Sequence, residues 1–418
     1  MRILIIGSGL IGVTTAYSLR RRGHEVMVID RQAGAGREAS FANGGLLTPS
    51  MADPWNAPGS WRLLLASLGR SDGAMQLHLR ALPALWHWGI AFLCNSRTAA
   101  FERNVRSNLR LALYSLEVMQ RLRRQTGIEY DRVARGSLRI FRDQGALEQA
   151  SAAADRLSSA GLRCRRLSPA ALMAFEPSLT PIVRHLTGAI HYESDETGDA
   201  HRFCVALADH AKRQGVDFRF LTEVESLEMR SGRVVAVVSG QDRFEADCYI
   251  VAAGCFTAPL IRLLGIRLPV QPVKGYSATL DYPSGPQALR TPIVDDKLHA
   301  VVVPFAGAIR VAGTAEFAGY DSSPNAKRIH NLLGMLREIL PDEPFNTAAA
   351  RSWCGLRAMS ADGVAIIGPT PVPNLMVNTG HGHLGWTMAA GSADLLADLI
   401  DGRPTSIDSK PYDARRSA

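Results

Sequence analysis

The first thirty residues constrain this chain more than any other segment. They contain, in order, an apolar strand, a glycine-rich turn, a helix and a second apolar strand that ends in an acid. In the turn, Gly7 permits a tight bend, Gly9 lets the backbone approach a pyrophosphate, and Gly12 lets the helix lie close to the sheet. Free N–H groups and the helix dipole favour an anion at this point. We therefore predict a βαβ unit that binds the ADP part of a dinucleotide.

The same unit offers further contacts to the dinucleotide. Asp30 ends the second strand and is placed to accept a hydrogen bond from the adenosine ribose. Arg31 follows directly and can add positive charge toward the cofactor. At the turn itself, the expected contacts also include Leu10 and Ile11.

Length and composition limit the classes of protein that remain. A chain of 418 residues exceeds what one growing core normally holds, so we expect two domains. The net charge of +8 suits anionic ligands, an anionic membrane surface or nucleic acid, but the absence of a nucleic-acid motif argues against the last. Six cysteines without paired or ligand spacing predict reduced core thiols in a cytoplasmic protein, with neither disulfides nor a metal site.

Region 51–126 is expected to be mainly helical, with a long basic helix over 97–125. Four tryptophans cluster in its first half: Trp55, Trp61, Trp86 and Trp88. The stretch 81–94 is the most apolar of the chain, but it is too short to span a bilayer, which needs about 20 residues. Its basic surroundings form either a solvated face or a peripheral contact with the cytoplasmic face of the inner membrane.

Two further glycine-rich segments favour a flavin over a nicotinamide as the redox group. Segment 39–49 follows the second strand, where a nicotinamide enzyme would normally continue with a helix, and its small residues let the backbone follow a flat ring system. In segment 379–391, a glycine loop leads directly into a helix. The N–H groups at that helix start would stabilise negative charge on a reduced ring.

These segments supply the predicted flavin contacts. The contacts are Ser40, Asn43, Gly44, Gly45 and Leu46 in the first segment, Gly380, Gly382, His383, Leu384, Gly385, Trp386 and Thr387 in the second, and Val224, Ala253 and Gly254 between them. Val224 is expected near the adenine, and the strand at 246–254 brings the last two residues to the dinucleotide. We therefore predict an α/β fold with a Rossmann-like FAD-binding domain and a substrate domain built on a mixed sheet.

The order of the elements predicts that both domains are discontinuous. The FAD-binding domain is assigned residues 1–50, 190–269 and 346–418. The substrate domain is assigned residues 51–189, an insertion over the cofactor, and the β-rich residues 270–345.

Seven motifs carry a resemblance to a known family. They are GSGLIG, S-x-x-N-x-G from Ser40 to Gly45, PWNAPG, SDETGD, PVKGYS, GLRAMSADG and GHGHLGWTMAAGS. Their order resembles that in the bacterial FAD-dependent D-amino acid dehydrogenases, relatives of D-amino acid oxidase and glycine oxidase, over nearly the whole chain. The resemblance implies non-covalent FAD, a D-amino acid oxidase-like fold and conversion of a D-amino acid to a 2-oxo acid and ammonia. It also implies that electrons pass to a quinone or another carrier in preference to oxygen.

An amino acid that is oxidised at Cα must be held by its carboxylate. Arg357 is the first candidate, because its planar fork can bind a carboxylate through two bonds and the matching family position has that role. Tyr276 is either a second donor to this carboxylate or an ordinary strand tyrosine, and Lys274 is expected on the same face.

The chain departs from the family pattern at three positions. Gly44 stands where alanine is common, Ala358 where proline is common, and His383 where threonine is common. An imidazole at position 383 could form a hydrogen bond to a substituent of the substrate, which favours a cyclic D-imino acid such as cis-4-hydroxy-D-proline. Alternatively, the ring packs on Trp386.

A second hypothesis concerns another class of protein. The chain could be the flavin-carrying subunit of an electron-transfer complex that docks through residues 51–126.

Overall fold

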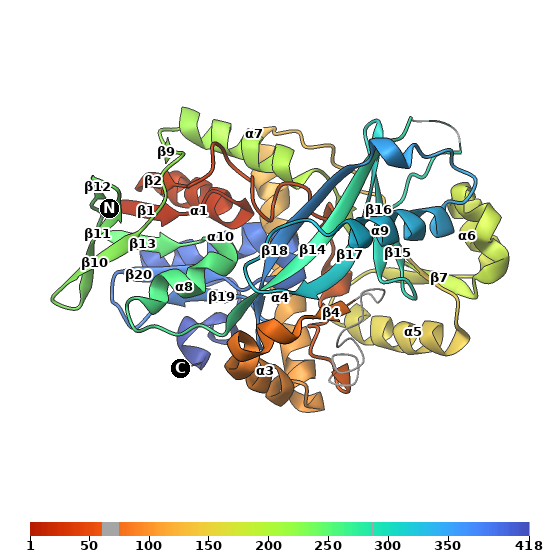
Figure 1. The fold of residues 1–418 in the computed structure, drawn as a ribbon, viewed down its shortest axis with the longest axis horizontal. Helices are drawn as coiled ribbons and strands as arrows, with labels where there is room; N and C mark the ends of the chain where they lie inside the picture. Colours follow the sequence, from red (N-terminus) through yellow and green to blue (C-terminus); the bar gives the residue numbers. More distant parts are fainter. Residues whose placement is uncertain (61–74, 284, 286, 418) are drawn as a thin grey trace.

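The structure, a computed structural model, describes residues 1–60, 75–283, 285 and 287–417. Two large sheets organise these residues, with most helices on their outer faces (Figure 1). Trp61 lies outside the described residues. None of the described helices is long and apolar enough to cross a bilayer.

The smaller of the two large sheets has six strands and contains the N-terminal unit. In spatial order they are β19 (Ile366–Pro369), β20 (Leu375–Thr379), β13 (Cys248–Val251), β1 (Arg2–Ile6), β2 (Glu25–Ile29) and β9 (Asp217–Arg219). All neighbouring pairs are parallel except β19 and β20. The central strands are rich in isoleucine and valine and are buried on both faces, as a parallel sheet covered by helices requires.

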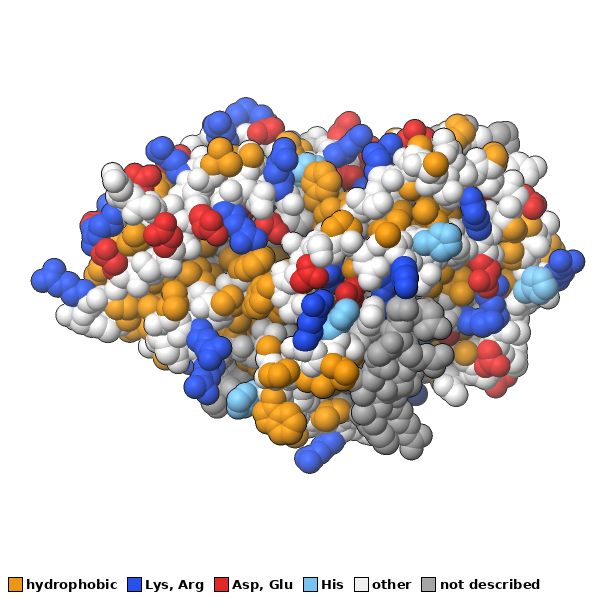
Figure 2. Space-filling view, in the orientation of Figure 1, with side chains coloured by type: hydrophobic (Ala, Val, Ile, Leu, Met, Phe, Trp, Pro, Cys, Tyr) orange, Lys and Arg blue, Asp and Glu red, His pale blue; other side chains and the backbone are white. Residues whose placement is uncertain are grey.

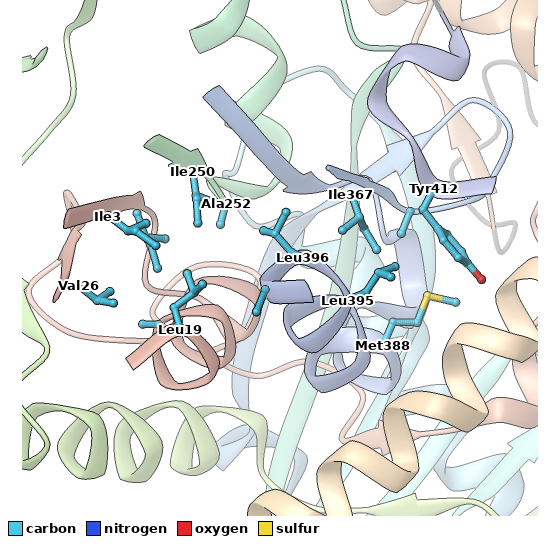
Figure 3. Packing of buried hydrophobic residues seen from close by; sticks show 14 of the residues in the cluster. Ile3, Leu19, Val26, Ile250, Ala252, Ile367, Met388, Leu395, Leu396 and Tyr412 are labelled. Carbon is cyan, nitrogen blue, oxygen red and sulfur yellow. The ribbon is translucent and has the colours of Figure 1, made fainter. Parts of the chain in front are cut away.

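Helices from distant parts of the sequence cover this sheet. They are α1 (Leu10–Arg21), α4 (Thr98–Thr126), α7 (Ala200–Arg213) and α10 (Gly385–Asp401). Helix α1 packs against both α7 and α10, and α10 packs against α4. Figure 3 shows the resulting core, in which Leu19 of α1 and Leu396 of α10 meet Ile3 and Ile250 of the sheet. This core fixes the starts of α1 and α10 relative to each other.

The larger sheet is mixed and carries the predicted substrate residues. Its strands are, in spatial order, β18 (Arg351–Ser360), β14 (Val270–Asp281), β17 (Ala308–Phe317), β16 (Ala300–Phe305), β15 (Ile293–Asp295), β5 (Ser137–Phe141), β7 (Gly188–Tyr192) and β6 (Cys164–Leu167), with β4 (Met75–Leu77) paired to β17. Helix α9 (Ala326–Ile339) packs on β14 and β17. Helices α5 (Gln144–Ser158) and α6 (Pro169–Phe175) lie near β7, toward the end of this sheet that is farthest from β18 (Figure 1).

Two further α-helices and two small groups of strands of the described chain lie outside the large sheets. They are α3 (Leu82–Asn95), α8 (Thr257–Arg262), the strand pair β3 (Leu46–Leu47) and β8 (Glu196–Thr197), and the sheet of β10 (Ser226–Arg230), β11 (Arg233–Ser239) and β12 (Asp242–Phe244).

Several local expectations are confirmed. The basic helix predicted over 97–125 is α4. The Asp199 side chain caps α7 by accepting a hydrogen bond from the Arg202 N–H. The hairpin turn between β10 and β11 lies at Ser231 and Gly232, both with positive φ.

Two elements pack across the predicted domain boundaries, which stay a prediction. Helix α4 lies in the segment assigned to the substrate domain, but Leu111 and Tyr114 of this helix belong to the same core as Ile3. Strand β18 lies in the segment assigned to the FAD-binding domain, but it pairs with β14 along ten residues. An amphipathic pattern shows which face of a helix is apolar but not which distant element covers it.

The cysteine prediction is correct for only part of the set. Cys204, Cys248 and Cys255 are buried, whereas Cys94 is exposed on α3. All six are free thiols.

Candidate active site

One cavity of about 1270 Å³ is lined by residues of both large sheets. It exceeds the roughly 300–1,000 Å³ of ordinary small-molecule pockets, so it has room for a dinucleotide together with a small substrate. Residues around the turn after β1 line one part of it, and residues of β15 to β18 line another.

The turn after β1 has the geometry that the glycine pattern predicts. Gly7 has φ +106°, and a Cβ there would lie 2.6 Å from the Ala252 carbonyl oxygen. A Cβ on Gly12 would lie 1.8 Å from the Gly7 carbonyl oxygen, so the helix touches the turn at this residue. The N-cap residue Gly9 has no side chain to cap α1, Leu10 N donates to Ser40 Oγ, and Leu10 and Ile11 line the cavity beside this turn. This helix start can therefore receive phosphate.

Asp30 lines the cavity and is held in place by its neighbours. One carboxylate oxygen accepts hydrogen bonds from Ser8 N (2.6 Å) and Ser8 Oγ (2.7 Å), and the other accepts from Gln32 N (2.8 Å). Arg31 also borders the cavity, but its guanidinium donates to Glu38 (2.7 Å) and lies over the Phe256 ring. The positive charge that we expected Arg31 to direct toward the cofactor is thus shared with Glu38.

The segment after β2 forms the wall that we expected. Ser40 Oγ accepts a hydrogen bond from Leu10 N (3.1 Å), which ties this segment to α1. Asn43 Oδ1 accepts from Gly45 N (2.9 Å), and Gly45 has φ +69° with the Phe305 ring beside it. These bonds hold the loop along the cavity.

The loop before α10 ends in an uncapped helix start with no acidic residue in its first turn. Two residues that line this part of the cavity, His381 and Trp386, each have a buried ring nitrogen without a hydrogen-bond partner among the described residues. The Trp386 ring packs against Tyr130 and Phe203 in the core. Burial lowers the pKa of His381 to about 3, so its ring is neutral. An unpaired nitrogen of His381 and a free helix start fit the polar edge of a flavin.

Most predicted cofactor contacts line the cavity, and three do not. Gly12 packs against Gly7. Leu384 lies in the core with 2% of its surface exposed, and Thr387 Oγ1 accepts a hydrogen bond from Thr48 N (2.9 Å). The side chains of Leu384 and Thr387 therefore serve packing, which differs from the expectation. Val224, Ala253 and Gly254 line the cavity, and their contact with the dinucleotide stays a prediction.

Arg357 projects from β18 into the cavity. Its Nη1 donates to the Thr314 carbonyl oxygen (3.2 Å), and its guanidinium lies 5.7 Å from the Trp55 ring centre. No carboxylate of the described residues lies within ion-pair distance of it. Burial lowers the pKa of Arg357 to about 10, so the group stays charged at neutral pH. A buried cation without a protein counter-charge favours an anionic ligand.

Gly275 provides the space that Arg357 occupies. A Cβ at position 275 would lie 2.1 Å from Arg357 Nη1, and this glycine does not have positive φ. Gly275→Ala should therefore fold with bound FAD but displace the guanidinium and raise KM for an amino acid at least about 10-fold, the loss of one charged hydrogen bond. Steady-state kinetics and thermal melting check this. An unchanged KM would mean that the guanidinium position does not matter.

Tyr276 is not brought together with Arg357. In the register of β14 and β18, Arg357 lies opposite Val273, so Val273 and Gly275 share its face and Tyr276 lies on the other. Tyr276 borders the cavity, but its hydroxyl donates to Glu316 (2.5 Å), which also lies near Lys274 Nζ. The bond to Glu316 favours the alternative of an ordinary strand tyrosine, and a contact of the phenol with the substrate carboxylate stays a prediction. The expectation that Lys274 and Tyr276 share a face is confirmed.

His383 lines the cavity but packs on Trp55 rather than on Trp386. The two rings are stacked with centres 5.6 Å apart, and His383 Nε2 lies 3.0 Å from the Met51 carbonyl oxygen. That contact requires a proton on Nε2. Burial lowers the pKa of His383 to about 4, against the opposing effect of the Met51 bond. The neutral ring therefore keeps Nδ1 as a hydrogen-bond acceptor.

The sequence did not single out two residues that shape this site. Trp55 contacts both the Arg357 guanidinium and the His383 ring, and only its place in the PWNAPG motif could have indicated it. Thr314 has φ +58°, unusual for a β-branched residue, and presents its carbonyl to Arg357. No sequence pattern reveals such a strained position.

A Rossmann-like sheet, two uncapped helix starts at one cavity and a glycine-lined wall between them define a flavin-dependent oxidoreductase. The comparisons agree: residues 2–399 match the model of the family described as FAD dependent oxidoreductase. The chain belongs to this family, and FAD is its cofactor.

Relatives match it over nearly their full length. A D-amino acid dehydrogenase of Paramagnetospirillum magneticum is 42% identical over 408 residues, covering 97% of this chain and 96% of the relative. A D-amino acid dehydrogenase of Xanthobacter autotrophicus is 40% identical over 419 residues, covering 100% and 99%.

Solved structures share the fold at low identity. Glycine oxidase from Geobacillus kaustophilus superposes with a TM-score of 0.77 at 22% identity, covering 99% of both chains. L-Proline dehydrogenase from P. horikoshii gives a TM-score of 0.78 at 18% identity, covering 100% of this chain and 97% of the other. Because the names of these two proteins refer to different substrates, the fold alone does not select one.

Proposed function

We propose that this enzyme oxidises D-amino acids to 2-oxo acids and ammonia. The observation that carries the proposal is the Arg357 guanidinium, which is charged, enclosed by protein and without a carboxylate partner among the described residues. Two relatives at about 40% identity are named D-amino acid dehydrogenases, which supports the D configuration of the substrate.

The side chains of the site would act by holding the substrate. Bound FAD supplies the acceptor for the hydride that leaves the substrate Cα. Arg357 binds the α-carboxylate through its fork, and the stacked Trp55 and His383 limit the positions open to the rest of the substrate. The neutral amine lone pair assists loss of hydride, and water hydrolyses the resulting imine to the 2-oxo acid and ammonia. Orientation therefore carries most of the catalysis.

An anaerobic titration tests this function. The purified flavoprotein is mixed with D-alanine, D-proline, cis-4-hydroxy-D-proline and their L-forms, and the bleaching of the oxidised flavin band is followed. Bleaching by several D-amino acids and not by their L-forms supports the proposal. Bleaching by the L-forms alone would contradict it.

A second substrate class is favoured by one observation. The neutral His383 ring donates through Nε2 to Met51, so Nδ1 is left as an acceptor at the cavity. A ring hydroxyl of a cyclic D-imino acid could donate to it. In the same titration, bleaching confined to cyclic imino acids would select this alternative over the broad D-amino acid specificity.

We further propose a peripheral site at the cytoplasmic face of the inner membrane, where a quinone or another carrier accepts the electrons. Large apolar side chains along α3 and just before it are exposed: Leu79 (67%), Leu82 (41%), Trp86 (66%), Ile90 (48%) and Leu93 (47%). Figure 2 shows apolar side chains gathered over α3 near the lower edge of the view. Those within α3 recur at helical spacing, which suits insertion at a lipid surface.

This surface gives a direct prediction. The double variant Trp86→Glu, Ile90→Glu should lose binding to anionic phospholipid vesicles by at least about 100-fold, because two large apolar groups no longer enter the lipid. Co-sedimentation measures the binding. Val205→Glu, an exposed apolar position on α7, is the matched control. Wild-type protein that stays in the supernatant would contradict the proposal.

The same exposed helix also suits the alternative of a flavin-carrying subunit that docks on a larger complex. The guanidinium clamp favours the enzyme, because a subunit that only carries electrons does not need a carboxylate site. Turnover of a D-amino acid by the isolated chain separates the two.

A further inference from the structure

Segment 51–56 runs along the cavity wall beside Arg357, and protein contacts hold both of its ends. The Met51 carbonyl accepts a hydrogen bond from His383 Nε2 (3.0 Å). Trp55 stacks on the same imidazole, and Asn56 Nδ2 donates to the Ala361 carbonyl oxygen (3.1 Å). The segment is thus fixed as part of the site.

Asp53 lies in the middle of this segment and lines the cavity with an exposed side chain. Within the described part of the chain, its carboxylate has neither a hydrogen-bond donor nor a cation at ion-pair distance. The protein around the cavity raises the pKa of Asp53, an effect that the charges of Arg139 and Arg156 oppose. Asp53 is therefore an exposed acid among the residues that line the cavity.

Arg139, whose charge acts on Asp53, already forms an ion pair with Asp296. Arg139 also lines the cavity, but its Nε and Nη2 both donate to one carboxylate oxygen of Asp296, at 3.0 Å and 2.5 Å. This ion pair engages Arg139, so Asp53 has no cation at ion-pair distance among the described residues. A carboxylate in such surroundings gains most from a hydrogen-bond donor on a ligand.

Asp53 shares its cavity with Arg357. It lies two residues before Trp55, whose ring centre is 5.7 Å from the Arg357 guanidinium, and all three residues line this cavity.

We propose that Asp53 determines substrate specificity. Its carboxylate accepts a hydrogen bond from a hydroxyl or ammonium group on the substrate side chain while Arg357 holds the α-carboxylate. This inference rests on the proposed function and adds a class of substrate to it: D-amino or D-imino acids whose side chain carries a hydrogen-bond donor.

Substrate pairs that differ by one donor test the inference. They are D-serine with D-alanine, D-lysine with D-norleucine, and cis-4-hydroxy-D-proline with D-proline. The wild type should favour the donor-bearing member of at least one pair in kcat/KM. Asp53→Ala should reduce that preference about 10- to 100-fold, the value of one charged hydrogen bond.

Asp53→Asn separates the two kinds of donor. The amide keeps an acceptor oxygen but loses the charge, so a preference for an ammonium group is lost and a preference for a hydroxyl is largely kept. Asp242→Asn, on the exposed strand β12, removes the same charge away from the cavity and should leave every ratio unchanged. FAD content and the visible spectrum show that each variant is folded, and Asp53→Asn carries the test if Asp53→Ala is unstable.

The outcomes distinguish a failure of the Asp53 inference from a failure of the proposed D-amino acid oxidation. If D-alanine bleaches the wild-type flavin but the wild type shows no preference, or Asp53→Ala keeps it, only the role of Asp53 is overturned. If no D-amino acid bleaches the flavin, the proposed function is overturned, and the specificity inference with it.

Discussion

Arg357→Ala should lower kcat/KM for D-alanine by about 10²- to 10⁴-fold. The wild-type fork can form two charged hydrogen bonds to the substrate carboxylate, each worth about 1.5–3 kcal/mol, and tenfold corresponds to about 1.4 kcal/mol. Arg357→Lys keeps the charge but not the fork, so a smaller loss of about 10- to 100-fold is expected. Both kcat and KM should change, because the clamp aligns Cα as well as binding the substrate.

Anaerobic stopped-flow reduction of the flavin measures this effect, because the electron acceptor plays no part in it. Arg243→Lys, on exposed strand β12, is the matched control and should reduce at the wild-type rate. FAD content must be equal in all variants. Reduction of Arg357→Ala by D-alanine at the wild-type rate would remove Arg357 from the substrate site.

The sequence predicted those parts of the site that local backbone chemistry determines. Gly7 needs positive φ, and Gly12 needs a position without a side chain, and both requirements leave a glycine in a fixed pattern. Arg357 could be named because few side chains bind a carboxylate through two bonds and the resemblance pointed to this one.

The other parts of the site depend on the pairing register of the strands and on contacts between distant segments. Tyr276 was a candidate second donor to the carboxylate that Arg357 holds, but the pairing of β14 with β18 puts the two residues on opposite faces. A shift of one residue would have reversed that result, and the sequence does not determine it. The role of Asp53 likewise depends on where segment 51–56 crosses the cavity, which the Met51–His383 contact sets.

The two helix starts explain why distant segments must fold together before FAD can bind. Helix α1 follows the first strand and α10 ends the chain's last βα unit, yet they pack directly against each other. Thr14 Oγ1 of α1 lies 3.2 Å from the Ala389 carbonyl oxygen of α10, within this contact. The phosphate site and the flavin site are therefore built on one rigid pair of helices. A change in the turn after β1 should disturb both.

Gly12→Ala should give a protein that lacks FAD and is destabilised by about 3 kcal/mol or more, because the new Cβ would lie 1.8 Å from the Gly7 carbonyl oxygen. That neighbour is backbone in a tight turn, so neither rotamer change nor a small shift relieves the contact. Visible absorbance measures the flavin, and thermal melting with and without added FAD measures stability. Gly334→Ala in helix α9, with nothing within 4 Å of its Cβ, should be as stable as wild type or more so. If Gly12→Ala purified with a full complement of FAD and an unchanged melting temperature, α1 would not depend on close contact with the turn.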